Sequence, residues 1–135
     1  MTDKWKINIV VSLLLVVAGS LVYLLFRQNI ILFDLLEHPK WLQTLSIEIQ
    51  TSNGFVCYFF LYCFSDMVWY AALLLLASTF YIKGNKTSTI LLVFSVVLPF
   101  IIEGMQFCRL FPGTFDWYDI FSYLITFIIF ILIWT

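Results

Sequence analysis

Long apolar runs alternate with short polar stretches along the whole chain. A bilayer core takes about 17–25 apolar residues in a helix. Pro99 lies inside the third of the long runs, where it removes a helical hydrogen bond and predicts a kink. The pattern predicts an all-α membrane protein, a bundle of four transmembrane helices, with spans at residues 7–26, 65–82, 87–108 and 117–134.

The second run is longer than one span requires. Residues 55–82 are apolar except for Ser65 and Asp66. One straight helix of that length would extend about 42 Å, against a core of roughly 30 Å. We therefore expect a break, with residues 55–64 as an interfacial or re-entrant segment. The second membrane helix would start at Ser65, because Ser and Asp accept hydrogen bonds from the free N–H groups of a helix start.

The connection between the first two helices has a mixed character. In residues 27–54, apolar residues alternate with charged ones and Pro39 interrupts the run. This composition predicts an amphipathic segment on the membrane surface, with Trp41 at headgroup level. Within the first run, Ala18, Gly19 and Ser20 are small enough to form a notch for helix packing.

Composition supports a membrane protein and limits its size. The chain has 135 residues, of which 63% are hydrophobic and 11% charged, and its mean hydropathy is +1.03. Soluble domains carry about 25% charged residues, so this chain has too few to cover a water-facing surface. Residues 1–135 are expected to form one transmembrane domain. The net charge of −1, without a basic run, argues against a nucleic-acid partner.

Charge also predicts the orientation in the membrane. Four spans would place both termini and the 83–86 connection on one side, with four lysines and one aspartate, a net +3. The other side would hold three basic and seven acidic residues, a net −4. Because short basic segments stay in the cytoplasm, both termini are predicted to be cytoplasmic.

Cysteine and histidine give little reason to expect a metal, a cofactor or nucleophilic catalysis. Cys57, Cys63 and Cys108 lack metal-ligand spacing and are interpreted as small packing residues. A Cys/His or Ser/His pair needs a nearby histidine, and the lone His38 is far from the other candidates in sequence. Paired carboxylates such as Glu103 and Asp119 leave acid–base chemistry open, but an enzyme is the less favoured interpretation.

A polar cluster stands out between the third and fourth spans. Glu103 and Gln106 are three residues apart and share one helix face, and Asp116 and Asp119 repeat that spacing on the next helix. In the predicted topology these residues meet others at the outer ends of the helices, and Asp66, Glu103 and Asp119 should lie close together. The predicted binding cluster comprises Asp66, Glu103, Gln106, Arg109, Asp116, Asp119 and Tyr123.

Two interpretations of this cluster remain open. In the first, it is structural: Asp66 and Asp116 cap helix starts, and Arg109 neutralises a nearby carboxylate. In the second, it is a binding pocket, because Glu103 lies about one turn inside its helix and capping does not explain it.

The motif around the cluster resembles that of a known family. Glu103-x-x-Gln106, followed by Pro112-Gly113-x-Phe115-Asp116-x-x-Asp119, is similar to the signature of VanZ-like membrane proteins. A related four-helix bacterial family of unknown function is also similar. The likeness covers roughly residues 65–126. Thr114 departs from the pattern, because VanZ-like proteins usually carry an arginine there.

The resemblance implies a protein of the bacterial inner membrane with a role in the cell envelope. On this interpretation the outward-facing pocket recognises a lipid headgroup, a glycoconjugate or a cation. The alternative is a small accessory subunit that docks to a larger membrane complex, for which the aromatic load (20%) is also suitable. The expected partners are membrane lipids, together with a larger complex or further copies of the chain.

Overall fold

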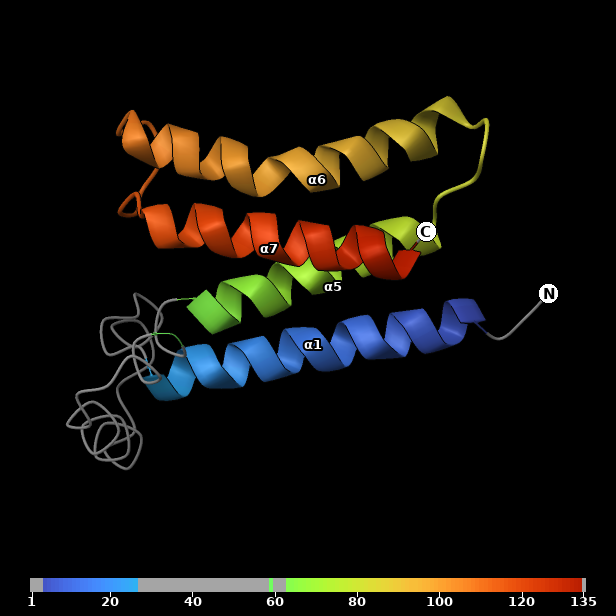
Figure 1. Ribbon diagram of the computed structural model, residues 1–135, viewed down its shortest axis with the longest axis horizontal. Coiled ribbons are helices and arrows are strands. Elements are labelled where there is room, and N and C mark those ends of the chain that lie inside the picture. The colour runs from blue at the N-terminus through green and yellow to red at the C-terminus, as the bar shows by residue number, and fades with distance from the viewer. Residues whose placement is uncertain (1–3, 27–58, 60–62, 135) are drawn as a thin grey trace.

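The protein is a bundle of four helices in the part of the chain that the structure describes. The computed structural model describes residues 4–26, 59 and 63–134, and this part contains no strand. The helices are α1 (Lys4–Phe26), α5 (Ser65–Thr79), α6 (Lys86–Phe107) and α7 (Trp117–Trp134) (Figure 1). The predicted all-α class is confirmed.

Three of the helices, α1, α6 and α7, are long and apolar enough to cross a membrane. The fourth, α5, has 15 residues and is about 22 Å long at 1.5 Å per residue. It is apolar but shorter than a full span. The predicted surface segment at 27–54, with His38, and Cys57 lie outside the described residues.

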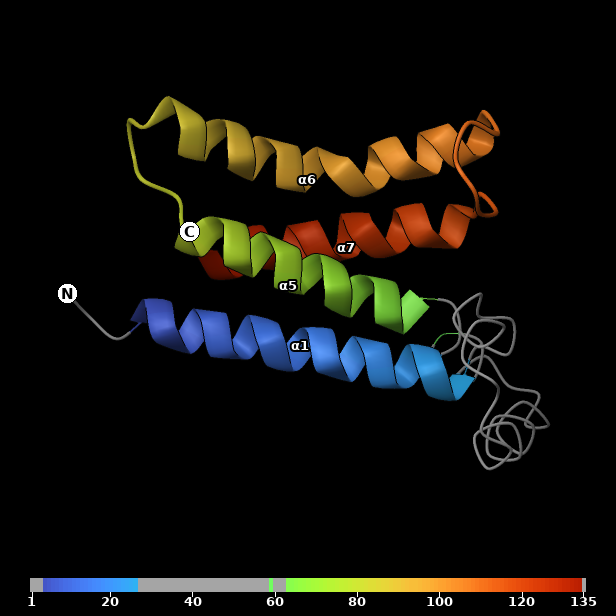
Figure 2. The same cartoon turned by 180° about the vertical axis from the view of Figure 1, so that it is seen from behind.

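Helix α5 is the centre of the bundle. It lies between α1 on one side and the α6–α7 pair on the other (Figures 1 and 2). The buried apolar side chains of Tyr70, Ala72 and Leu74 all belong to α5. Large apolar side chains cover the outer faces of the other three helices instead, as is expected where lipid replaces water around a protein.

Helices α1 and α5 meet at Gly19. A Cβ atom placed on Gly19 would lie 2.8 Å from the Trp69 ring and 3.3 Å from the Ser65 carbonyl oxygen. The Trp69 indole also donates to the Val16 carbonyl, at 3.3 Å, and packs against Tyr23, with ring centroids 5.2 Å apart. The predicted packing notch is therefore confirmed, and Gly19 is the residue that makes it.

Helix α5 begins at Ser65, as predicted, but its N-cap position is Phe64 and not Ser65. Cys63 and Phe64 form a π-type turn that leads directly into the helix. Phe64, at the N-cap position, has helical dihedral angles (φ −64°, ψ −44°), and its side chain makes no capping hydrogen bond. Ser65 is buried, with 1% of its surface exposed, so helix packing accounts for this small side chain.

The connection from α5 to α6 is a tight turn held by side chains. Helix α5 ends at Thr79, three residues before the predicted end. The Ser88 hydroxyl accepts from the Ile82 N–H (3.1 Å), and Gly84 adopts a positive φ of 86°. Asn85 then caps α6 by accepting from the Thr87 N–H at 2.9 Å.

Helix α6 bends near its middle (Figure 1), where Pro99 lies inside the helix. Proline supplies no N–H and displaces the preceding turn, which leaves carbonyl groups free for other donors. The hydroxyl of Tyr70 on α5 donates to the Val96 carbonyl at 2.9 Å. The bend is thus tied to the central helix.

In the part of the chain that the structure describes, charged residues are confined to the two ends of the bundle. Helices α5 and α7 begin, and α6 ends, at one end, whereas α1 begins and the 80–85 connection lies at the other (Figure 1). We name them the acidic end and the basic end. The acidic end carries Asp66, Glu103, Arg109, Asp116 and Asp119. The basic end carries Lys4, Lys6, Lys83 and Lys86.

Candidate functional site

All seven residues of the predicted cluster belong to the acidic end, on α5, on α6, on α7 and in the connection between α6 and α7. Asp66 and Asp119 lie in the first turns of α5 and α7. The positive ends of these helix dipoles stabilise both carboxylates. Glu103 lies near the C-terminal end of α6, the negative end of the helix dipole, and so the dipole does not stabilise its carboxylate.

Glu103 is the most unusual residue of the site. Its side chain is 4% exposed, and its Oε2 atom has no hydrogen-bond partner within the described residues. The backbone N–H of Asp116 supplies a hydrogen bond to the carboxyl group, and the Asp116 carboxylate is near enough to repel it. A buried carboxyl oxygen without a donor is costly. Glu103 therefore has unused capacity to accept a hydrogen bond.

Arg109 has a backbone role at the end of α6. It adopts a left-handed φ of 57°, and its N–H donates to the Gln106 carbonyl at 2.9 Å. The next residue, Leu110, donates to the Met105 carbonyl at 2.8 Å, which completes a Schellman motif. The Arg109 side chain is exposed and forms no ion pair with any residue in the described ranges. It therefore does not neutralise Glu103.

Gln106 is held against the connection that follows α6. A Cβ atom on Gly113 would lie 2.5 Å from Gln106 Nε2, so only glycine leaves room for the amide. Gly113 also adopts a φ of 133°, a conformation that L side chains rarely adopt. The glycine of the Pro112-Gly113 pair thus allows both the turn of the chain and the position of Gln106.

The start of α7 confirms one capping prediction. Asp116 Oδ1 accepts from the Tyr118 N–H at 3.0 Å, so Asp116 is a helix cap. Beyond it, α7 turns a polar stripe inward, because Asp119, Ser122 and Thr126 are all buried. The two hydroxyls donate to carbonyls four residues earlier, at 2.7 and 2.8 Å. Asp119 is therefore on the inner face of the bundle, as a site residue requires.

Cys63 connects the start of α5 with α7. It is buried, with 6% of its surface exposed, and a hydrogen bond joins its thiol to Ser122. The carboxylates of Asp66, Asp116 and Asp119 all lie close enough to act on it electrostatically. The packing interpretation is confirmed for Cys63 but is wrong for Cys108, which is exposed in the turn after α6.

Asp66 and Tyr123 meet across a small pocket of about 150 Å³ between α5, α6 and α7. Tyr70 forms its aromatic wall, with its ring centroid 5.4 Å from that of Tyr123. The sequence analysis missed Tyr70 and Trp69. Their spacing was a signal, because they follow Asp66 by four and three residues and so share its helix face.

The carboxylates share one end without forming a metal-ligand set. Within residues 4–26, 59 and 63–134, no group of three His, Cys, Asp or Glu side chains could hold a metal ion. Asp66 lies with Tyr123, and Glu103 lies with the start of α7. The predicted close approach of Asp66, Glu103 and Asp119 stays a prediction.

Together, fold and site define a small helical membrane protein with a polar cluster at one end of its bundle. Comparisons with protein-family models, with curated proteins and with solved structures found no match to this chain. The proposed function therefore depends on the geometry of the acidic end and on the motif that runs through it.

Proposed function

We propose that the chain is a VanZ-like protein of the bacterial inner membrane whose acidic end binds a hydrogen-bond-donating, cationic headgroup of an envelope ligand. The observation that carries this proposal is Glu103, which is 4% exposed and has one carboxyl oxygen without a donor. A protonated primary amine supplies both the missing hydrogen-bond donors and a positive charge. The motif that spans Glu103 and Asp119 supports the family.

Electrostatics at the acidic end also favour a cation. Four carboxylates face one guanidinium there, a formal charge of −3, and two of the carboxylates, Glu103 and Asp119, are buried. Arg109, the only basic residue that the structure describes at this end, is exposed and unpaired with them. An acidic concentration of this kind attracts cations to the membrane surface and disfavours anions.

The structural interpretation of the cluster accounts for only part of it. Asp116 caps α7, and the helix dipole favours Asp119. Asp66 lies in the first turn of α5, where the helix dipole also favours a carboxylate, whereas Glu103 is neither a cap nor ion-paired within the described residues. Capping thus leaves unexplained Glu103, the most deeply buried carboxylate of the cluster.

The basic end supports the proposed orientation of the protein. Lys4, Lys6, Lys83 and Lys86 lie in short segments there, which the positive-inside rule assigns to the cytoplasm. The acidic end then faces outward, where it meets headgroups of the outer leaflet of the inner membrane. We propose a recognition function for this end rather than an enzymatic one.

The test compares retention of phosphatidylethanolamine with that of phosphatidylcholine. Both headgroups are zwitterionic, but only the first has N–H donors. Native mass spectrometry of the full chain, purified from nanodiscs that contain equal amounts of both, should show preferential retention of phosphatidylethanolamine. Glu103→Gln keeps the side-chain volume and removes the charge, and it should reduce that preference by roughly tenfold or more.

Gly104→Ala is the matched control. Gly104 is the next residue of α6, and a Cβ there meets nothing within 4 Å. Ala is also the better helix former, so this variant should keep the lipid preference and gain up to about 1 kcal/mol of stability. If Glu103→Gln folds and retains phosphatidylethanolamine as the wild type does, the acidic end does not recognise the amine.

A further inference from the structure

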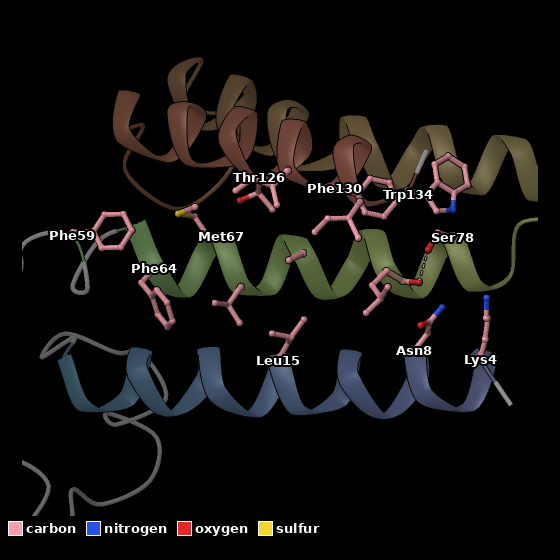
Figure 3. A pocket seen from close by; sticks show the side chains of 15 residues that line it. Lys4, Asn8, Leu15, Phe59, Phe64, Met67, Ser78, Thr126, Phe130 and Trp134 are labelled. Atoms are coloured by element: carbon pink, nitrogen blue, oxygen red, sulfur yellow. Dashed lines mark hydrogen bonds between the residues drawn. The ribbon is translucent and has the colours of Figure 1, made fainter.

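A large groove lies on the other side of α5 from the pocket at Asp66. It is enclosed by α1, α5 and α7, and its volume is about 760 Å³, within the range of small-molecule sites. Figure 3 shows its lining. Leu15, Met67 and Ala71 contribute to a predominantly apolar surface along most of its length.

Polar groups gather at one end of this groove. Lys4, Asn8 and Ser78 line it near the basic end of the bundle, beside the indole of Trp134 (Figure 3). The Ser78 hydroxyl donates to the Leu75 carbonyl at 2.8 Å. The far end is lined by Phe59, Phe64 and Thr126, whose hydroxyl is already satisfied by the Ser122 carbonyl. The groove thus has one polar, cationic end and one apolar end.

The polar end of the groove carries the residue types that are typical of a membrane interface. Trp134 packs against Tyr81 of the α5–α6 connection, with ring centroids 5.7 Å apart, and Lys6 lies over the ring of Trp5 nearby. Tryptophan and tyrosine with lysine are typical of the headgroup region. We therefore expect Lys4, at the start of α1, to lie near lipid phosphates.

We propose that this groove binds one anionic phospholipid, with an acyl chain along α5 and the phosphate at Lys4 and Asn8. Charge selects the lipid, because Lys4 is exposed at the groove end and forms no ion pair within the described residues, and Lys83 and Lys86 add positive potential at the same end. Length fits as well. The axis of α5 advances about 16 Å from Met67 to Ser78, which matches the roughly 15 Å of one leaflet.

The proposal is independent of the amine site, because the phosphate contacts lie at the basic end and the groove is lined by no residue of the predicted binding cluster. A transmembrane helix of a second copy would also cover an apolar groove. Such a helix would place apolar side chains beside Lys4. The Lys4 ammonium would then have no anion to pair with, and the Asn8 amide would have no hydrogen-bond partner. A phospholipid satisfies both the polar and the apolar part.

Native mass spectrometry of the full chain, purified from nanodiscs of phosphatidylcholine and phosphatidylglycerol in equal amounts, tests the proposal. The wild type should retain one phosphatidylglycerol in preference. Lys4→Gln should weaken that preference about fivefold. Lys86→Gln removes a charge from the same end, but Lys86 does not line the groove. This variant should change the preference less than twofold, because a charge that does not contact the lipid is screened by salt. Ala71→Trp, which fills the groove, should release the lipid.

Three results would overturn the proposal. The first is equal retention of both lipids by the wild type. The second is an equal effect of Lys4→Gln and Lys86→Gln, which would show general attraction to a basic surface. The third is a dimer that Ala71→Trp converts to a monomer without loss of lipid, which would assign the groove to a second copy. The two lysine variants decide the matter even if Ala71→Trp does not fold, because both lysines are exposed at helix starts.

Discussion

Gly19→Leu is expected to lower the free energy of unfolding by about 2–3 kcal/mol, because overpacking a tight helix contact costs this much. A Cβ alone at this position would lie 2.8 Å from the Trp69 ring and 3.3 Å from the Ser65 carbonyl oxygen. The carbonyl belongs to the backbone of α5, and so has little freedom to move. Unfolding in detergent, followed by tryptophan fluorescence, measures the loss.

Ala18→Leu is the control for this variant. Ala18 is the preceding residue of α1 and is exposed, so a leucine side chain there points away from α5 and should change the free energy of unfolding by less than about 0.5 kcal/mol. Trp69→Ala should in turn relieve much of the Gly19→Leu clash, since the ring is the nearest atom group. Additive effects of Gly19→Leu and Trp69→Ala would contradict the contact.

Gly113→Ala is expected to cost about 1–3 kcal/mol in unfolding free energy and also to weaken binding of phosphatidylethanolamine. The cost in stability arises from the φ of 133°, which an L side chain rarely adopts. The loss of binding arises because the new Cβ would lie 2.5 Å from Gln106 Nε2 and must displace that amide from the acidic end. Unfolding and lipid retention are measured on the same purified variant.

Gly84→Ala separates the two effects. Gly84 also has a positive φ, 86°, but a Cβ there meets nothing within 4 Å, and it lies in the connection at the basic end. It should therefore cost comparable stability and leave retention of phosphatidylethanolamine unchanged. If both glycine variants reduce retention equally, the position of Gln106 does not matter for binding.

Apolar run length located the helices accurately. Helix α7 matches its predicted span of 117–134, and α6 matches 87–108 to within one residue at each end. A membrane span must be apolar over its whole length, so its limits are visible in a single sequence. Gly19 and the Asp116 cap were predictable for a related reason, since each depends on a local property of one side chain.

Features that depend on the rotation and pairing of helices were not predictable. An apolar helix in lipid shows little difference between its inner and outer faces, so hydropathy does not identify the face of α5 that packs on α1. The bond from Tyr70 to the Val96 carbonyl depends on which helix lies beside the Pro99 bend. The groove at Lys4 requires three helices from distant parts of the chain.

Two further differences have local causes that hydropathy does not reveal. The helical conformation of Cys63 and Phe64 carries the chain into α5 without a cap, so Ser65 was assigned a capping function that packing fulfils instead. The structural interpretation of the cluster paired Arg109 with a carboxylate, but its left-handed backbone ends α6 and its side chain is exposed. In both places the backbone conformation decides the role of the residue.

The central claim is that the acidic and basic ends lie on opposite sides of one membrane, and thiol labelling tests it most directly. Cys108 is exposed at the acidic end, and Lys83→Cys would place a thiol in the exposed turn at the basic end. Each thiol is tested alone, with the other cysteines replaced by alanine, using a membrane-impermeant maleimide on right-side-out and inverted vesicles. We predict that Cys108 reacts from the outside and the thiol at position 83 from the inside. Reaction of both from the same side would contradict the topology and, with it, the outward-facing binding site.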